Sequence, residues 1–154
     1  AGQCANANTR TPLARAEARP HVAGHADRLQ QVLLNLLLNA IQAMPDGGSL
    51  RVETSAVRRQ RPGLEMTPEQ TFVCVEITDT GVGIPHELRD KIFEPFYTSK
   101  EGSGGTGLGL AVCSGIVKEH DGWLEVDDGP RGGTTFRIFL PEEGVERHDT
   151  VAAP

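Results

Sequence analysis

Four amide side chains recur at helical spacing in the segment 27–44. Gln31, Asn35, Asn39 and Gln42 are separated by four, four and three residues, so a helix would align them in one stripe beside a leucine-rich face. Solvated helix faces usually carry charges, and neutral amides favour a half-buried polar face, where a full charge would be costly. An Asn oxygen can complete the octahedral shell of a Mg²⁺ that phosphates already carry. The stripe is therefore typical of either a solvated face or a metal–phosphate site.

An acidic residue follows the apolar segment 72–78, which is typical of a buried strand. Asp79 opens the turn DTGVGIP at 79–85, and an acid at the carboxyl end of a strand is well placed for a ligand in the crevice there. Gly81 and Gly83 would let the backbone approach that ligand closely. The alternative is an ordinary strand-to-helix turn. Aspartic proteases also use Asp-Thr-Gly, but they need two copies and nothing else in the sequence fits such an enzyme.

A glycine-rich segment, GSGGTGLGL at 102–110, leads directly into a predicted helix. Such a backbone at a helix N-terminus offers free N–H groups and the positive end of the helix dipole to phosphate. The preceding residues 97–101 form a polar loop and not a strand, which excludes a Rossmann dinucleotide site, and no Gly-Lys-Ser/Thr follows, which excludes a Walker loop. The segment is a phosphate loop of unspecified family or a hinge.

Hydrophobic periodicity predicts the elements that must position these segments. Helices are predicted at 27–44, 86–92 and 108–120, and strands at 50–57, 72–78, 123–126 and 134–140. They predict an α/β (α+β) two-layer sandwich, whose mixed, mostly antiparallel sheet is covered on one face by helices. Residues 21–141 would form this single domain. Residues 1–20 would be a flexible lead-in, native or partly vector-derived, and 142–154 a disordered tail.

Composition excludes several classes of function. The 154 residues suffice for one domain, and a formal net charge of −6 argues against binding to nucleic acid. The longest apolar stretch is interrupted by Asn35 and is far too short to span a membrane. Three cysteines without a CxxC pair argue against zinc and against a disulfide framework, and they make a reducing, cytoplasmic compartment the default.

Four motifs, in order along the chain, resemble the N, G1, F and G2 boxes of the histidine-kinase catalytic domain, a branch of the gyrase, Hsp90, histidine kinase and MutL ATPase superfamily. NLLLNA at 35–40 resembles the N box, DTGVGIP at 79–85 the G1 box, IFEPFY at 92–97 the F box and GTGLGL at 105–110 the G2 box. Each box alone is a weak signal for the family, but four boxes in order and at compatible spacing are highly specific. The resemblance covers about residues 22–141 and implies a Bergerat-type ATP-binding fold.

The resemblance also implies a role for each matching residue. Asn39 would bind Mg²⁺, and Asp79 would accept the adenine amino group, which discriminates against purines that lack this donor. Asn35, assisting at the phosphates, and Lys100, meeting the β- and γ-phosphates, would be the catalytic candidates, although Lys100 also fits a solvated loop lysine. The other ATP contacts would be Gly81 and Gly83 in the floor of the adenine pocket, Ile84 in the same box, Thr134 on the far side of the base, Phe93 and Phe96 as anchors of a mobile lid, and Gly105, Thr106, Gly107, Leu108 and Gly109 at the phosphates.

Two departures from related families bear on the phosphate acceptor. Gyrase-type ATPases and anti-sigma-factor serine kinases place a Glu where this chain has Asn35, so we expect slow hydrolysis and a histidine acceptor, whose neutral imidazole demands less help from a base. The sequence HELR at 86–89 is superficially similar to the family's acceptor motif. Asp90 and Lys91 depart from that motif, and the segment lies where the family has a connecting helix, so His86 is not the expected acceptor.

The resemblance implies the catalytic domain of a two-component sensor histidine kinase. It would bind Mg-ATP and donate the γ-phosphoryl group to a histidine on a dimerisation domain outside this chain, and a response regulator would act downstream. A free-standing serine kinase of the anti-sigma type and a degenerate nucleotide-binding scaffold are the alternatives.

Overall fold

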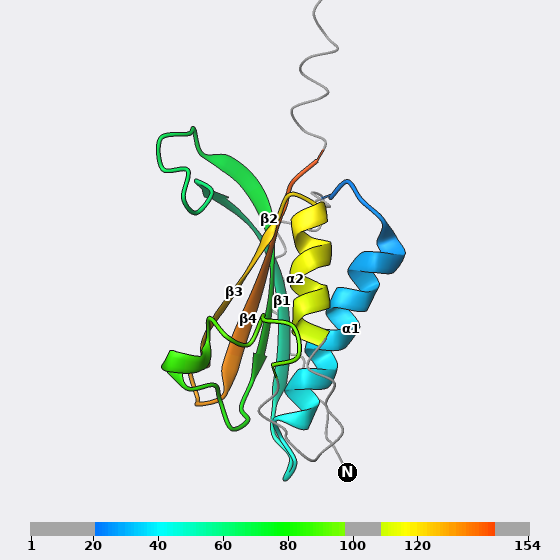
Figure 1. Ribbon diagram of the computed structural model, residues 1–154, viewed down its shortest axis with the longest axis vertical. Coiled ribbons are helices and arrows are strands. Elements are labelled where there is room, and N and C mark those ends of the chain that lie inside the picture. Colours follow the sequence, from blue (N-terminus) through cyan, green and yellow to red (C-terminus); the bar gives the residue numbers. More distant parts are fainter. Residues whose placement is uncertain (1–20, 98–108, 144–154) are drawn as a thin grey trace, which may run out of the picture.

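The computed structural model describes residues 21–97 and 109–143, which form two layers (Figure 1). One layer is an antiparallel sheet of strands β1 (Leu50–Arg59), β2 (Gln70–Asp79), β3 (Trp123–Asp128) and β4 (Thr134–Pro141), in the order β1-β2-β4-β3. The helices α1 (Ala26–Gln42) and α2 (Gly109–Glu119) cover one face of this sheet. The predicted α/β sandwich is confirmed, with every pair of described strands antiparallel.

The first helix forms where the apolar period predicted it. Val32, Leu36 and Ala40 recur every four residues and are buried against the sheet and α2. The helix ends at Gln42, two residues earlier than predicted, and the segment PDGG at 45–48 prevents its continuation. The segment predicted as a helix at 86–92 contains only the short 3-10 helix η2 (His86–Leu88), followed by turns. None of the described helices is long and apolar enough to cross a membrane.

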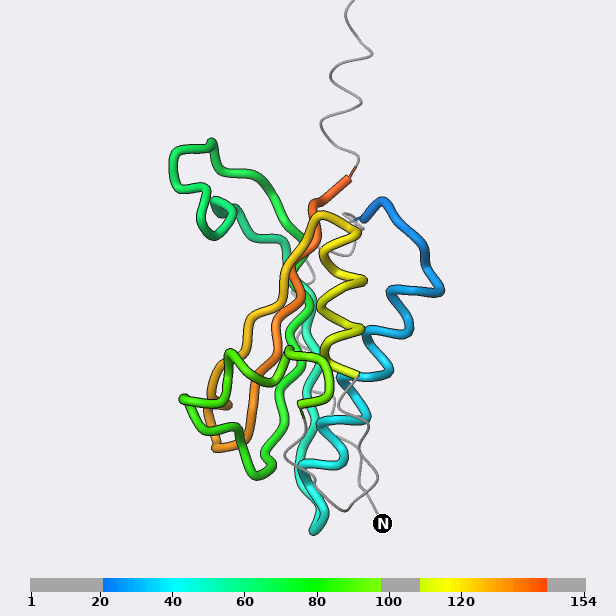
Figure 2. The backbone as a smooth tube through the Cα atoms, in the orientation of Figure 1, coloured from blue at the N-terminus to red at the C-terminus, as the bar shows by residue number. Residues whose placement is uncertain are grey.

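The sheet register brings the ends of two central strands together. Thr78 of β2 pairs with Thr135 of β4, and their hydroxyl oxygens lie 3.0 Å apart. Asp79 therefore leaves β2 beside Thr134, where β4 begins. Figure 2 shows that the turn after β2 and the β3–β4 turn lie at the same end of the molecule as the C-terminus of α1, whereas the β1–β2 loop extends from the other end.

The main core lies between the helices and the sheet, and a second cluster covers part of the outer face. The main core contains fully buried Leu36 and Val117. The outer cluster is aromatic: the Trp123 ring stacks on Phe139 at 4.7 Å, and the Arg59 guanidinium lies 4.7 Å from the centre of the Phe139 ring. This outer cluster was not predicted from the sequence.

Removing the side chain of Leu36 should destabilise the domain strongly. Leu36 is 0% exposed, so Leu36→Ala leaves a cavity and should lower the free energy of unfolding by about 2–5 kcal/mol. Leu34 belongs to the same helix but is 57% exposed, so Leu34→Ala should change it by less than about 0.5 kcal/mol. Urea unfolding followed by circular dichroism measures both. Equal losses would contradict the described packing of α1.

Two buried thiols should be unreactive in the folded domain. Burial, and then the nearby Glu76 carboxylate, raises the pKa of Cys74 to about 11 from an ordinary value of 9.0, and burial also raises the pKa of Cys113. At pH 8 both thiols should resist iodoacetamide until urea is added, as mass spectrometry of their peptides would show. Because the raised pKa of Cys74 belongs to the folded state, its contribution to stability is complete below pH 9 and is lost as the pH rises towards 11. Equally rapid labelling without urea would contradict this prediction.

Candidate functional site

The carboxyl group of Asp79 is buried and half satisfied. The residue is 2% exposed, and its Oδ1 accepts hydrogen bonds from the Gly81 N–H at 2.8 Å and from the Thr134 N–H at 3.2 Å. Within residues 21–97 and 109–143, no donor reaches the second oxygen. A buried carboxylate gains from every donor that it finds, so a ligand amine at this oxygen would be bound with high selectivity. Asp79 is thus held in one orientation, and its second oxygen has no donor from the described residues.

The turn after β2 lies directly against the end of α1. The Val82 N–H donates to the Ala43 carbonyl oxygen at 3.1 Å. A Cβ on Gly81 would lie 2.3 Å from that same oxygen, so glycine is required by the close approach of two backbones. The Thr80 hydroxyl also accepts a hydrogen bond from the Ser49 N–H at 2.9 Å, which links the turn to the start of β1. These contacts fix Asp79 relative to the helix that carries the two asparagines.

The β3–β4 turn packs on the other side of Asp79. Gly133 has φ +80, and a Cβ there would lie 2.2 Å from the Asp79 carbonyl oxygen and 2.7 Å from its Oδ1. Gly83 has φ +74 and approaches the Gly133 carbonyl oxygen. Gly133 was not predicted as a site residue, although the two adjacent glycines before Thr134 were the available signal. The turn after β2 is therefore held between α1 and the β3–β4 turn.

The amide stripe of α1 is half-buried only at its centre. Asn35 and Asn39 are half-buried, whereas Gln31 and Gln42 are exposed. The Cys113 thiol of α2 donates to the Val32 carbonyl oxygen at 3.8 Å, and the nearby Asn35 amide opposes the effect of burial on the pKa of Cys113. Asn39 has no hydrogen bond to another side chain within the described part of the chain. A half-buried neutral amide oxygen of this kind suits a divalent cation that also binds phosphate.

The remaining predicted contacts divide into four groups. Ile84 and Phe93 pack against the main core, and Phe93 meets Phe136 edge-on at 6.5 Å. Phe96 has φ +66 and is 76% exposed, so its role as an anchor stays a prediction. Gly109 opens α2. The predicted phosphate contacts Lys100, Gly105, Thr106, Gly107 and Leu108 lie outside the described residues.

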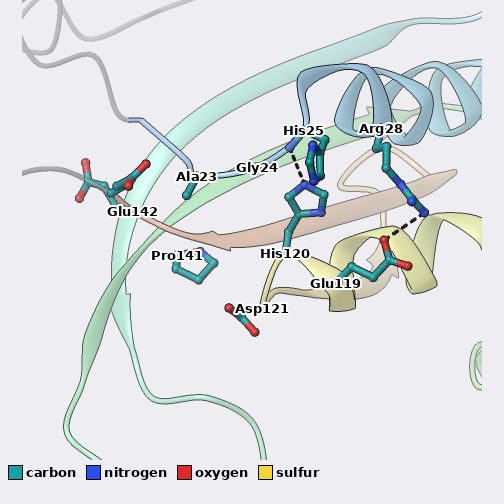
Figure 3. A pocket seen from close by; sticks show the side chains of 10 residues that line it. Ala23, Gly24, His25, Arg28, Glu119, His120, Asp121, Pro141 and Glu142 are labelled. Carbon is teal, nitrogen blue, oxygen red and sulfur yellow. Dashed lines mark hydrogen bonds and ion pairs between the residues drawn. The ribbon is translucent and has the colours of Figure 1, made fainter.

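A cavity of about 490 Å³ lies at the opposite end of the helix pair, away from Asp79 (Figure 3). Here His120 links the two helices: its Nε2 accepts a hydrogen bond from the His25 N–H at 3.0 Å, and its Nδ1 donates to the Ile116 carbonyl oxygen at 2.7 Å. The cavity is lined by the acidic side chains of Glu119, Asp121, Glu142 and Glu143, against Arg28. This charge is unsuited to a polyphosphate, so the cavity is not the nucleotide site.

Comparison with known proteins identifies the family. Residues 24–144 match the family described as Histidine kinase-, DNA gyrase B-, and HSP90-like ATPase. The chain is 46% identical over 127 residues to the sensory histidine kinase/phosphatase NtrB of Rhodobacter capsulatus and 44% identical over 117 residues to the sensor kinase CckA of Brucella abortus. These alignments cover 79% and 74% of this chain but only 34% and 12% of the two relatives.

Solved structures agree with the sequence comparison. The mycobacterial sensor histidine kinase MprB is 34% identical, with a TM-score of 0.63 over 80% of this chain and 76% of that chain. ShkA in complex with AMPPNP is 28% identical, with a TM-score of 0.64 over 82% of this chain and 24% of that one. The resemblance to histidine kinases is confirmed: the chain belongs to the histidine kinase-, DNA gyrase B- and HSP90-like ATPases and is a histidine-kinase ATP-binding catalytic domain.

Proposed function

We propose that the domain binds adenine at Asp79 and the phosphates near Asn35 and Asn39, and that it presents the γ-phosphoryl group to a histidine on another domain. The observation that carries this proposal is the buried Asp79 carboxylate, with one oxygen held by two N–H groups and the other without a donor in the described chain. An adenine amino group is a donor of the kind that this oxygen lacks. The structural neighbour ShkA was solved in complex with AMPPNP, which supports nucleotide binding by a domain of this fold.

Asn39 is the proposed ligand of Mg²⁺. Its half-buried amide oxygen is neutral, which suits a cation whose charge the phosphates largely balance. Asn35 lies one turn earlier on α1, is half-buried, and would assist at the phosphates. When bound, Mg²⁺ would neutralise charge that develops on the transferred phosphoryl group.

The proposed mechanism is mainly orientation. Asp79 would fix the base, α1 the metal and phosphates, and the acceptor histidine would approach in line with the bond that breaks. Asn35 supplies no general base, so activation of water is poor and a neutral imidazole is the favoured nucleophile. We further propose that a dimerisation domain carries this histidine, that a response regulator receives the phosphoryl group, and that the domain works in the cytoplasm.

Calorimetric titration of ATP into this chain, with and without Mg²⁺, tests the binding step. We expect saturable binding that is stronger with Mg²⁺. Phosphotransfer is then tested by adding the dimerisation domain of the parent kinase and radiolabelled ATP. A phosphohistidine product is stable in alkali and labile in acid, whereas a phosphoserine product would favour a serine kinase. Absence of ATP binding by the folded chain would contradict the proposal.

A further inference from the structure

Arg89 makes the only ion pairs of the segment 80–97 within the part of the chain that the structure describes. It follows η2, and its guanidinium Nη1 lies 3.5 Å from Oδ1 of Asp127 and its Nη2 2.5 Å from Oδ1 of Asp128. We propose that Arg89 is a positioning residue for the adenine pocket, because it fixes the end of β3, and with it the β3–β4 turn, against the segment that follows the turn at 79–85. This inference rests on the proposed function.

The partners of Arg89 end β3, immediately before the turn that touches Asp79. The turn begins at Gly129, whose N–H donates to the Gly133 carbonyl oxygen at 3.1 Å. Gly133 in turn packs on the backbone and carboxylate of Asp79. A shift of the end of β3 would therefore move Gly133 and the Thr134 N–H, one of the two donors that orient the Asp79 carboxylate.

The ion pairs are part of a network that crosses the outer face of the sheet. Arg137 of β4 bonds Glu76 of β2 through Nε at 2.9 Å and lies 3.5 Å from Oδ2 of Asp127. The Asp127 carboxylate accepts a hydrogen bond from the Asp128 N–H and lies near Arg137 and Arg89. These contacts lower the pKa of Asp127 and keep it ionised. Through this network Arg89 joins the segment that follows the turn at 79–85 to the strands β3, β4 and β2.

The burial of Arg89 indicates that its position is constrained. Its side chain is only 14% exposed, although Asp127 and Asp128 are 58% and 75% exposed. The Nε donor of Arg89 is buried and has no acceptor among the residues that the structure describes, which is unfavourable for a charged group. The two terminal nitrogens of this guanidinium pair with two different carboxylates, although its Nε lacks an acceptor there. A role in fixing the geometry of the adjoining turns explains this arrangement better than a simple surface ion pair does.

The preference for ATP over inosine triphosphate, ITP, tests the inference in this chain. In ITP a carbonyl oxygen stands in place of the adenine amino group, whose hydrogen bond Asp79 would accept. The dissociation constant for ITP divided by that for ATP therefore reports the placement of Asp79 and not general stability. We expect Arg89→Ala to reduce this ratio about tenfold and Arg89→Lys to reduce it less, since one ammonium cannot pair with both carboxylates as a fork does. Arg89→Asp combined with Asp128→Arg should restore the ratio.

Arg28→Ala is the matched control, because it removes the ion pair with Glu119 at the opposite end of the helices and should leave the ratio unchanged. An unchanged ratio in Arg89→Ala, or equal weakening of both nucleotides, would overturn the positioning role. If Arg89→Ala does not fold, Asp128→Asn makes the same comparison. A folded, unmodified chain that binds neither nucleotide would instead overturn the proposed function, and this inference with it.

Discussion

Replacing Asp79 with asparagine should lower the affinity for ATP about 100-fold while weakening ITP much less. Oδ1 of Asp79 accepts two backbone N–H groups, from Gly81 and Thr134, so the asparagine carbonyl must take that position. Its NH₂ group then faces the base, where it opposes the adenine amino group but can donate to the carbonyl oxygen of hypoxanthine. The substitution is nearly isosteric, so the effect should come from hydrogen bonding and not from packing.

Calorimetric titration of both nucleotides at fixed Mg²⁺ measures this change of preference. Asp121→Asn is the control, because Asp121 is exposed, lies at the opposite end of α2 and has φ +60, a conformation that asparagine tolerates. It removes the same charge from the chain and should alter neither affinity. Equal losses of ATP and ITP in Asp79→Asn would show that Asp79 supports the fold without reading the base.

The elements with a strong local period could be predicted from the sequence. The leucine spacing of α1 and the β-branched run of β2 gave their type and approximate bounds, since each pattern reflects burial of one face or of both. The prediction of a helix at 86–92 was wrong, because a short run of apolar spacing does not establish a helix. Packing around Ile92 and Phe93 holds this segment in turns. Local pattern was thus sufficient only for long elements.

The candidate site residues also differ in whether a local motif could predict them. Asp79, Asn35 and Asn39 could be predicted as candidates because they stand in local motifs, and the structure brings the turn of Asp79 against the end of the helix that carries the asparagines, at Ala43. Arg89 and Gly133 instead contact residues far away in the sequence, Asp128 and Asp79 respectively. Neither the charges nor the glycines of a single sequence predict such contacts, because these residues meet only after β3 and β4 have paired in register.

Alanine at two neighbouring glycines should have very different effects. Gly132 and Gly133 have φ +78 and +80, so alanine is strained at both by a similar amount, about 1–2 kcal/mol. At Gly132 the new Cβ meets nothing within 4 Å. At Gly133 it would lie 2.2 Å from the Asp79 carbonyl oxygen, a backbone atom that cannot rotate away. Gly133→Ala should therefore lose about 1–3 kcal/mol more stability than Gly132→Ala.

The difference between the two variants isolates the contact with Asp79 from the cost of the backbone conformation. Because relief of the clash at Gly133 requires the β3–β4 turn to move away from Asp79, Gly133→Ala should also lose most of its ATP binding under conditions where it is folded, whereas Gly132→Ala should keep it. Thermal unfolding and calorimetric titration of both variants measure the two effects. If Gly133→Ala bound ATP as tightly as Gly132→Ala, the β3–β4 turn would not shape the adenine pocket, and the role of Arg89 would lose its physical basis.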